Sequence, residues 1–223
     1  MDEKINFGKV ILKIKKGKHF LLKIDKRLFY RPGQYIDIYE INERKKILDK
    51  RAFTLAQKTN EYETEIYISQ VDKGKFSNML SKLEVGDTIY FSDPEGLCIH
   101  QRTNKNKIIM IALGSGISTY RSYIYNHIDN KDLEFNLFYA NKHEEDFFFK
   151  QDFLELEEYK NNFKFYPVVT EEKNLFKEMD LFLSKYKNLE EYDILVSGPM
   201  KANQKIIEFL ENKKIKAENI LID

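Results

Sequence analysis

The sequence has no tryptophan, one cysteine and few residues that break regular structure, with 4 prolines and 9 glycines among 223 residues. The single Cys98 cannot form an internal disulfide, and it cannot supply the several thiolates that a zinc site or an iron–sulfur cluster requires. Any metal centre that the protein uses must therefore come from a partner. The scarcity of proline and glycine argues against collagen-like, low-complexity and disordered chains.

Long apolar runs and an export signal are also missing. The N-terminus MDEKINFGKV lacks a basic head followed by an apolar stretch, and no run approaches the roughly 18 apolar residues of a membrane span. The histidines, His19, His100, His127 and His143, show no spacing typical of metal ligands, so we interpret them as surface residues. These observations predict a cytoplasmic protein with no membrane partner and no metal site.

Aromatic and charged residues are abundant instead. The chain contains 17 phenylalanines and 14 tyrosines, enough for substantial hydrophobic cores, and 33% of its residues are charged. The net charge is only +1, but residues 1–51 carry 15 Lys or Arg against 7 Asp or Glu, whereas residues 144–193 carry 7 Lys against 14 Asp or Glu. The basic segments alternate like strands and include no recognition helix or aromatic platform, so we expect no nucleic acid partner.

The first hundred residues read as a β domain. Apolar and polar residues alternate with period two in short runs separated by Gly, Pro, Asp or charged turns, at residues 9–16, 19–24, 34–40, 63–71 and 87–93. One short helix is predicted over residues 75–83, where the apolar side chains recur at helical spacing. About six strands in this length predict a small antiparallel barrel, which we assign to residues 1–103.

After a polar linker near residues 101–107 the pattern changes to alternating strands and helices. Strands are predicted at residues 107–113, 134–140, 163–170, 193–197 and 219–223, and helices at 117–128, 146–160, 175–187 and 200–214. A β–α alternation without hairpin signals predicts a parallel sheet covered on both faces. We assign this α/β domain to residues 104–223, and we interpret the aromatic run 147–149 as helix core.

Two turns of the α/β domain are candidates for binding a nucleotide. Gly114-Ser115-Gly116 joins the first strand to its helix, where glycines and free N–H groups can receive a phosphate. The dinucleotide pattern G-x-G-x-x-G is incomplete because its last position is Thr119, and a tight turn without a ligand explains the glycines equally well. Ser197-Gly198-Pro199 starts a later helix and lies beside the first turn if their strands are neighbours, but it also suits an ordinary helix start.

The β domain has two candidate segments of its own. In Arg51-Ala52-Phe53-Thr54, the guanidinium suits a phosphate, the ring can stack on a planar group and the hydroxyl can bond to a heteroatom. The alternative is a strand with a surface Arg and a buried Phe. The segment Lys73-Gly74-Lys75-Phe76-Ser77 opens the helix of this domain, with backbone donors and two lysines suited to phosphate.

Taken in order, the motifs PGQYIDI, RAFT, KGKFS, VGD, DPEG, GSGI with Arg121 and Ser122 after it, LFYANK leading into EEDFFF, VVT and VSGPM span nearly the whole chain. In this order and spacing, the chain resembles the ferredoxin–NADP reductase family of flavin oxidoreductases, in the branch without an attached iron–sulfur domain. The resemblance implies a barrel that binds FAD, or alternatively FMN, and an α/β domain that binds NADH or NADPH.

The resemblance also implies roles for individual residues. Arg51 would hold the flavin phosphate or pyrophosphate, Phe53 would lie against the isoalloxazine, and Thr54 would bond near flavin N5. The phosphate end of the flavin would lie at Lys73, Gly74, Lys75, Phe76 and Ser77. In the second domain Gly114 and Gly116 would receive the nucleotide pyrophosphate, Thr170 would lie near the adenosine, and Ser197, Gly198 and Pro199 would border the nicotinamide. Thr54 and Ser197 are the candidate catalytic residues.

The implied reaction passes a hydride from the nicotinamide to the flavin, and then single electrons to an acidic acceptor such as ferredoxin or flavodoxin, which the basic first segment would attract. Alternatives are the reductase component of an oxygenase, a free-flavin or quinone reductase, and a flavin-binding module without turnover. The flavin-binding module is an alternative because two residues depart from the family pattern. Ser197 stands where the family usually has Cys, and Thr119 stands where it usually has Pro. Glu171 and Glu172, which follow Thr170, would repel a 2′-phosphate and favour NADH.

Overall fold

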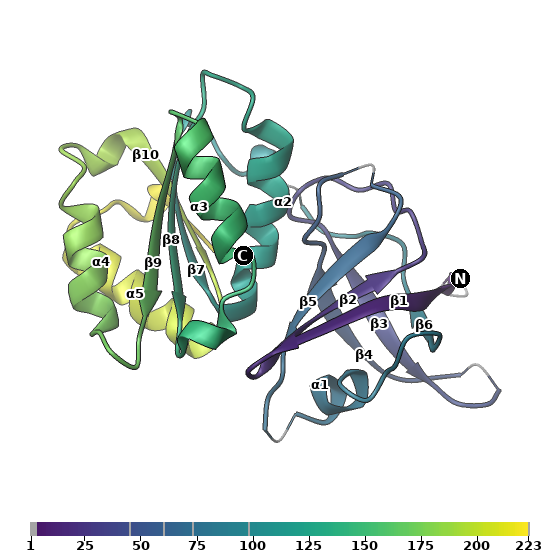
Figure 1. The fold of residues 1–223 in the computed structure, drawn as a ribbon. Helices are drawn as coiled ribbons and strands as arrows, with labels where there is room; N and C mark the ends of the chain where they lie inside the picture. Colours follow the sequence, from purple (N-terminus) through teal and green to yellow (C-terminus); the bar gives the residue numbers. More distant parts are fainter. Residues whose placement is uncertain (1–3, 45, 60, 73, 98, 223) are drawn as a thin grey trace.

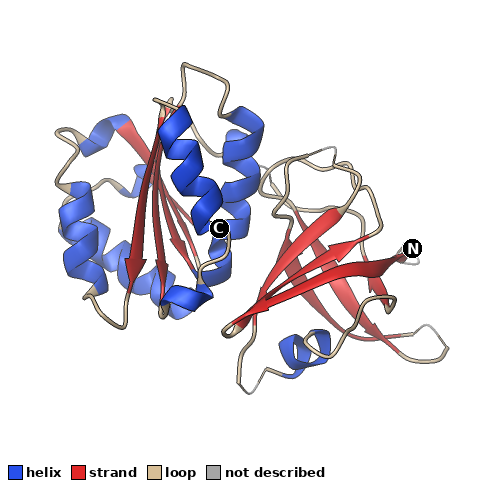
Figure 2. Ribbon diagram, viewed as in Figure 1, coloured by secondary structure: helices blue, strands red, loops and turns tan. Residues whose placement is uncertain are grey.

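The computed structural model describes residues 4–44, 46–59, 61–72, 74–97 and 99–222. Within these residues the chain forms two domains in sequence order, and the second domain alternates strands with helices (Figures 1 and 2). Lys73, which the sequence placed in the flavin site, and Cys98 lie outside the described residues.

Over its described residues, the first domain is an antiparallel sheet of six strands with one short helix. The strands are β1 (Asn6–Lys16), β2 (His19–Ile24), β3 (Tyr35–Ile41), β4 (Ile47–Thr54), β5 (Thr64–Ser69) and β6 (Thr88–Phe91), and the helix is α1 (Lys75–Leu80). Alternate apolar side chains such as Leu22, Ile36, Ile38 and Phe91 point to one buried core, which fixes the register of the sheet. The predicted antiparallel β domain is confirmed.

The sheet curls towards closure but is open along part of one seam. Its strand order is β4-β3-β6-β1-β2-β5, so β4 and β5 are the two edge strands. The described residues show one bridge between these edges, from Leu55, just after β4, to Ile66 in β5. Because the described residues show no further bridge between β4 and β5, residues 51–54 lie on an unpaired edge of the sheet, and we call this break in the strand pairing the opening of the barrel.

The second domain is a parallel sheet with helices on both faces (Figure 1). Its strand order is β11-β10-β7-β8-β9, with β7 (Lys107–Leu113), β8 (Glu134–Asn141), β9 (Phe163–Val169), β10 (Tyr192–Ser197) and β11 (Ile220–Ile222). The helices are α2 (Ile117–His127), α3 (Lys150–Tyr159), α4 (Leu175–Leu183) and α5 (Met200–Asn212). Short 3₁₀ turns lie at Ile99–Gln101, Gly114–Gly116, Glu144–Asp146, Leu189–Glu191 and Ala217–Asn219.

Alternate residues of β7 belong to two different cores, which explains why this strand is apolar throughout. Met110 and Ala112 pack in the core that contains α2 and α3 residues, whereas Ile109 and Ile111 pack in the core that contains α4 and α5 residues. A strand buried on both faces is typical of a parallel sheet, as predicted. Within the described residues, no helix combines the length and apolar character needed to cross a lipid bilayer.

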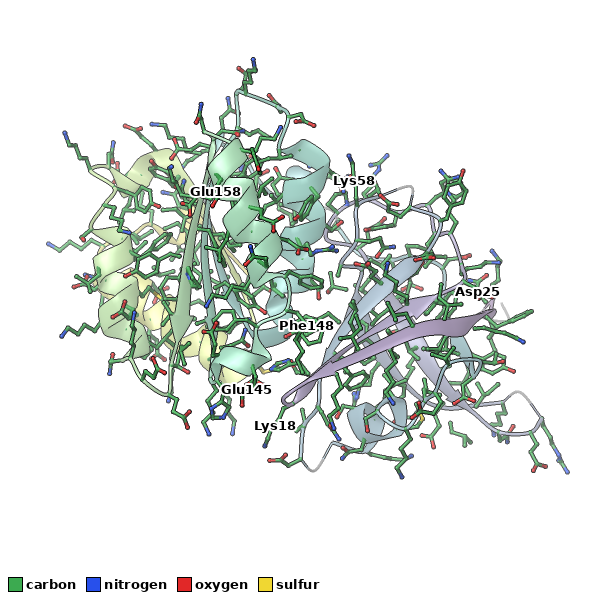
Figure 3. The ribbon with its side chains drawn as sticks, viewed as in Figure 1. Lys18, Asp25, Lys58, Glu145, Phe148 and Glu158 are labelled. Atoms are coloured by element: carbon green, nitrogen blue, oxygen red, sulfur yellow. The ribbon has the colours of Figure 1, made fainter. Side chains whose placement is uncertain are left out.

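The prediction of a helix over residues 146–160 is wrong at its start. The helix α3 begins at Lys150, and Phe149 has a left-handed backbone with φ of 62°. The physical reason is tertiary packing. Phe148 contacts Tyr67 of the barrel, with 4.9 Å between ring centroids, and does not continue the helix towards its N-terminus. Figure 3 shows Phe148 at the place where the two domains meet. Its burial between domains outweighs the local preference for helix.

Candidate functional site

Arg51, Phe53 and Thr54 lie together at the opening between β4 and β5. Phe53 is half-buried and packs on Phe76 of α1, with 6.1 Å between ring centroids. The Arg51 side chain is exposed, and none of the described residues makes a hydrogen bond or ion pair with its guanidinium. Thr54 pairs in register with Tyr35 at the end of the strand. A planar group at this opening would meet an aromatic ring and a free cation, so these residues fit a flavin and its phosphate.

The start of α1 is a tight turn held by its own polar groups. The Ser77 hydroxyl accepts a hydrogen bond from the Val71 backbone N–H at 3.1 Å, and the Gly74 N–H donates to the Val71 carbonyl at 2.8 Å. A Cβ on Gly74 would lie 2.8 Å from Ser77 Oγ, so the turn requires glycine there. Lys75 is exposed and forms an ion pair with Glu40 at 2.8 Å, and this hydrogen bond raises the pKa of the Lys75 ammonium.

The two glycine turns of the second domain touch each other. The strands β7 and β10 are neighbours, with Ser197 paired to Ala112, which brings the turns that follow them side by side. A Cβ on Gly116 would lie 2.2 Å from the Ser197 carbonyl oxygen, and one on Gly198 would lie 2.8 Å from Leu113 Cβ. Both glycines are therefore required by close backbone packing, and Ser197 is buried beside them.

Gly114 faces the barrel instead. Its φ is +55°, and the atoms nearest to a Cβ built on it are His19 Cε1 and Ser69 Oγ, each at 3.6 Å. A cavity of about 370 Å³ opens at this point between the domains. Its walls include Gly114, Thr170 and Pro199, three of the residues that the sequence singled out, together with Ser69 and Gln70 at the end of β5. The carboxyl ends of the parallel strands thus open towards the barrel, which is where α/β sheets hold ligands.

The sequence did not identify His19 as part of this cavity, and the expectation that it is a surface residue is wrong. Its side chain is only 10% exposed, because it stacks on Tyr67 and lies against the second domain. His19 Nδ1 is 2.9 Å from Ser69 Oγ, and Nε2 is 4.0 Å from the buried carboxylate of Asp146. Burial lowers the pKa of the His19 imidazole, and the Asp146 carboxylate acts in the opposite direction.

The turn at Gly17 and Lys18 in the barrel packs against Asp146 of the second domain. Asp146 accepts a hydrogen bond from the Lys18 backbone N–H at 3.2 Å, and a Cβ on Gly17 would lie 2.2 Å from its carboxylate. Lys18 and Asp146 are 128 positions apart in the chain. Gly17 is the only local signal for this contact, and a glycine in a hairpin turn does not say which distant residue will pack on it.

We expect the stability contributed by His19 to depend on pH. Because burial lowers its pKa in the folded protein below the ordinary value of 6.5, the unfolded chain takes up the proton first. The free energy of unfolding should therefore fall as the pH drops below about 6.5, and His19→Gln should lose this part of the dependence. Urea denaturation of both proteins from about pH 5 to about pH 8 measures the difference. A difference that is constant over this range would contradict the assignment.

Comparison with known proteins agrees with this geometry. Residues 11–100 match the oxidoreductase FAD-binding domain, and residues 110–205 match the oxidoreductase NAD-binding domain. The chain belongs to the ferredoxin–NADP reductase family of flavin oxidoreductases. The expected enzyme class, an NAD(P)H-dependent flavoprotein reductase, and the expected FAD and nicotinamide cofactors are confirmed at the level of the family.

The names of individual relatives state different roles. The chain is 25% identical over 208 residues to NAD(P)H-flavin reductase from Vibrio harveyi, covering 87% of this chain and 86% of that protein. It is 28% identical over 159 residues to the reductase component of phenol 2-monooxygenase from Pseudomonas sp., covering 70% of this chain and 43% of that protein.

Other relatives are longer than this chain. It is 25% identical over 169 residues to one component of the Na(+)-translocating NADH-quinone reductase of Psychrobacter cryohalolentis, covering 69% of this chain but only 40% of that protein. Among solved structures, a ferredoxin NADP+ reductase from Neisseria gonorrhoeae with bound FAD and NADP has a TM-score of 0.85 at 17% identity, over 100% of this chain and 99% of that one. That likeness shows a shared two-domain fold.

Proposed function

We propose that the protein oxidises NADH, with FAD seated at the opening between β4 and β5 and the nicotinamide at the carboxyl ends of β7 and β10. The observation that carries this proposal is the cavity between the domains, because one space is bordered by Gly114 and Pro199 of the nucleotide domain and by Ser69 of the barrel. FAD supplies the step from a two-electron hydride donor to single-electron acceptors. The chain itself supplies binding and orientation.

In the barrel, the exposed Arg51 guanidinium would bind the flavin phosphate or pyrophosphate, because no described residue competes for it. Phe53, held by Phe76, would give the isoalloxazine a flat apolar support, and Thr54 would offer its hydroxyl near N5. The phosphate end would lie at the turn that Gly74 and Ser77 shape, with Lys73 and Lys75 supplying positive charge.

In the second domain, Gly114 would let the nucleotide pyrophosphate approach the backbone, with Gly116 keeping the turn in place. Ser197, Gly198 and Pro199 would border the nicotinamide. Ser197 is small and buried, so it would limit the space beside the ring and exclude water there rather than carry charge.

The choice of NADH rests on the end of β9. Thr170 lies in the cavity wall, and its backbone N–H donates to the Asn141 carbonyl at 2.8 Å. The next residue, Glu171, is held by His143 at 2.6 Å, so a carboxylate is fixed beside the expected adenosine position. A 2′-phosphate would be placed near Glu171 and Glu172, and this repulsion favours NADH over NADPH.

The electron acceptor we propose is an acidic carrier such as ferredoxin or flavodoxin, because the barrel carries the basic first segment of the chain. Free flavin is the second candidate, supported by the match to NAD(P)H-flavin reductase over most of both chains. The oxygenase-reductase alternative is supported by the phenol 2-monooxygenase relative. Rates of reoxidation of the reduced protein by each acceptor distinguish the three.

The test is a visible spectrum of the purified protein, followed by separate anaerobic additions of NADH and NADPH. We expect flavin bands that bleach rapidly with NADH and at least about tenfold more slowly with NADPH, the discrimination that roughly 1.4 kcal/mol of repulsion provides. Flavin bands that neither nucleotide bleaches would support a flavin-binding module without turnover. A colourless protein that takes up neither FAD nor FMN would refute the proposed function.

A further inference from the structure

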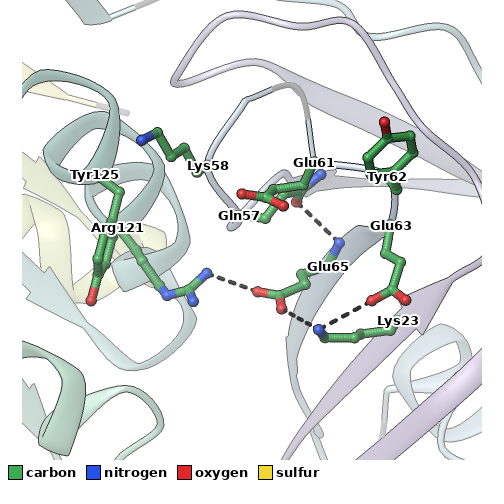
Figure 4. Close-up of a pocket in the computed structure, with 9 residues that line it drawn as sticks. All are labelled: Lys23, Gln57, Lys58, Glu61, Tyr62, Glu63, Glu65, Arg121 and Tyr125. Atoms are coloured by element: carbon green, nitrogen blue, oxygen red, sulfur yellow. Dashed lines mark hydrogen bonds and ion pairs between the residues drawn. The ribbon is translucent and has the colours of Figure 1, made fainter.

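Arg121 of α2 reaches out of the nucleotide domain and binds the barrel. Its Nη1 donates to the Ala56 carbonyl at 2.9 Å. The same atom donates to the Glu65 carboxylate at 2.8 Å, as Figure 4 shows. Ala56 follows Thr54 by two residues, and Glu65 lies in β5, the other strand that borders the opening in the barrel. A single guanidinium therefore contacts the segment that follows β4 and the start of β5.

The same guanidinium is fixed by its own domain. Its carbon lies 4.2 Å from the centroid of the Phe149 ring and 5.3 Å from that of Tyr125, and Nη2 is 3.8 Å from the Asp152 carboxylate. The Arg121 side chain is only 15% exposed, which strengthens both the ion pair and the cation–π contacts. Phe149 owes its position to the left-handed backbone that precedes α3. Arg121 is thus held between rings on one side and the barrel on the other.

Neighbouring residues of α2 add further contacts along the same face of the helix. The Ser122 hydroxyl lies 3.0 Å from the Tyr30 hydroxyl, and the Asn126 side chain accepts a hydrogen bond from the Thr59 backbone N–H at 3.3 Å. The helix α2 begins directly after Gly114–Gly116, so a displacement of this helix displaces the nucleotide turn with it. Because α2 contacts the barrel near Thr54, these contacts hold the nucleotide turn Gly114–Gly116 at a defined distance from Thr54.

We infer that Arg121 is a positioning residue that sets the separation between the flavin half and the nucleotide half of the site; this inference rests on the proposed function. Hydride transfer requires the donor and acceptor atoms to be held within a fraction of an ångström, so a loosened interface slows it without weakening either cofactor's own contacts. A lysine cannot reproduce the role, because it lacks the planar fork that meets a carbonyl and a carboxylate together while stacking on a ring.

The test compares Arg121→Met with Lys23→Gln. Lys23 pairs with the same Glu65 at 3.1 Å and with Glu63 at 3.2 Å, but both partners belong to the barrel, so its loss removes a cation from the network without touching the other domain. We expect Arg121→Met to lower the rate of flavin reduction by NADH about tenfold with little change in KM or in FAD content. Arg121→Lys should fall between, and Lys23→Gln should match the wild type.

A second readout uses the protein without cofactors. Amide hydrogen exchange should be faster in residues 55–59 and in α2 for Arg121→Met, and unchanged for Lys23→Gln. If Arg121→Met does not fold, Arg121→Lys carries both measurements. A wild-type rate, or a slower rate without faster exchange, would overturn the inference. Failure of the wild-type protein to be reduced by NADH would instead refute the proposed function.

Discussion

Replacing Gly116 by alanine is expected to lower the rate of flavin reduction by NADH about 100-fold while leaving FAD binding unchanged. A Cβ at this position would lie 2.2 Å from the Ser197 carbonyl oxygen, 2.5 Å from its carbon and 2.9 Å from the Gly198 nitrogen. All three atoms belong to the backbone, so no side-chain rotation relieves the clash. The two turns must separate by about 1 Å, and a misplacement of that size in a site for two reactants costs about 100-fold in rate.

Stopped-flow reduction of the FAD-loaded protein measures this effect. Ser115→Ala changes the residue between the two glycines without adding an atom, and we expect its melting temperature to equal that of the wild type. Gly116→Ala should melt at a lower temperature, because the strain lies in the nucleotide domain. Reduction of Gly116→Ala at the wild-type rate would show that the contact between the turns does not position the nucleotide.

Replacing Arg51 by methionine is expected to weaken FAD binding roughly 10- to 100-fold, the loss of a charge-assisted hydrogen bond of about 1.5–3 kcal/mol. The stability of the protein without flavin should change little, because the Arg51 guanidinium is exposed and bonded to no described residue. This combination separates a binding residue from a structural one, since a structural arginine would lower stability in the absence of flavin.

Titration of the apoprotein with FAD, followed by flavin fluorescence, gives the dissociation constant. The matched control is Lys50→Met, which removes the same charge from the adjacent position of β4, where Lys50 forms an ion pair with Asp37 at 2.8 Å. We expect this control to bind FAD about as tightly as the wild type. Equal weakening in both variants would mean that general charge, rather than Arg51 itself, attracts the flavin.

Local sequence patterns predicted most of the fold. Period-two alternation located the barrel strands, and the apolar run at residues 107–113 identified the first parallel strand because it is buried on both faces. The turn 114–116 and the helix start at 197–199 were found from glycine and proline, whose backbone preferences are intrinsic. These signals work because each depends on neighbours within a few positions.

Other features depended on packing between distant segments. Residues 147–149 read as helix, yet Phe148 packs on Tyr67 and the helix starts later. The sequence predicts a surface position for His19, yet this residue is buried beside Gly114.

The amino-acid sequence by itself determined the two domains, their classes and the two candidate turns of the α/β domain, because alternation, burial on two faces and turn chemistry are encoded locally. Only the tertiary structure decided which of those turns meet, and that Arg121 binds Ala56, 65 positions earlier in the chain. The physical reason is that an arginine or a histidine has no local preference for a partner. Its partner is selected when the burial of two surfaces brings remote groups within hydrogen-bonding distance.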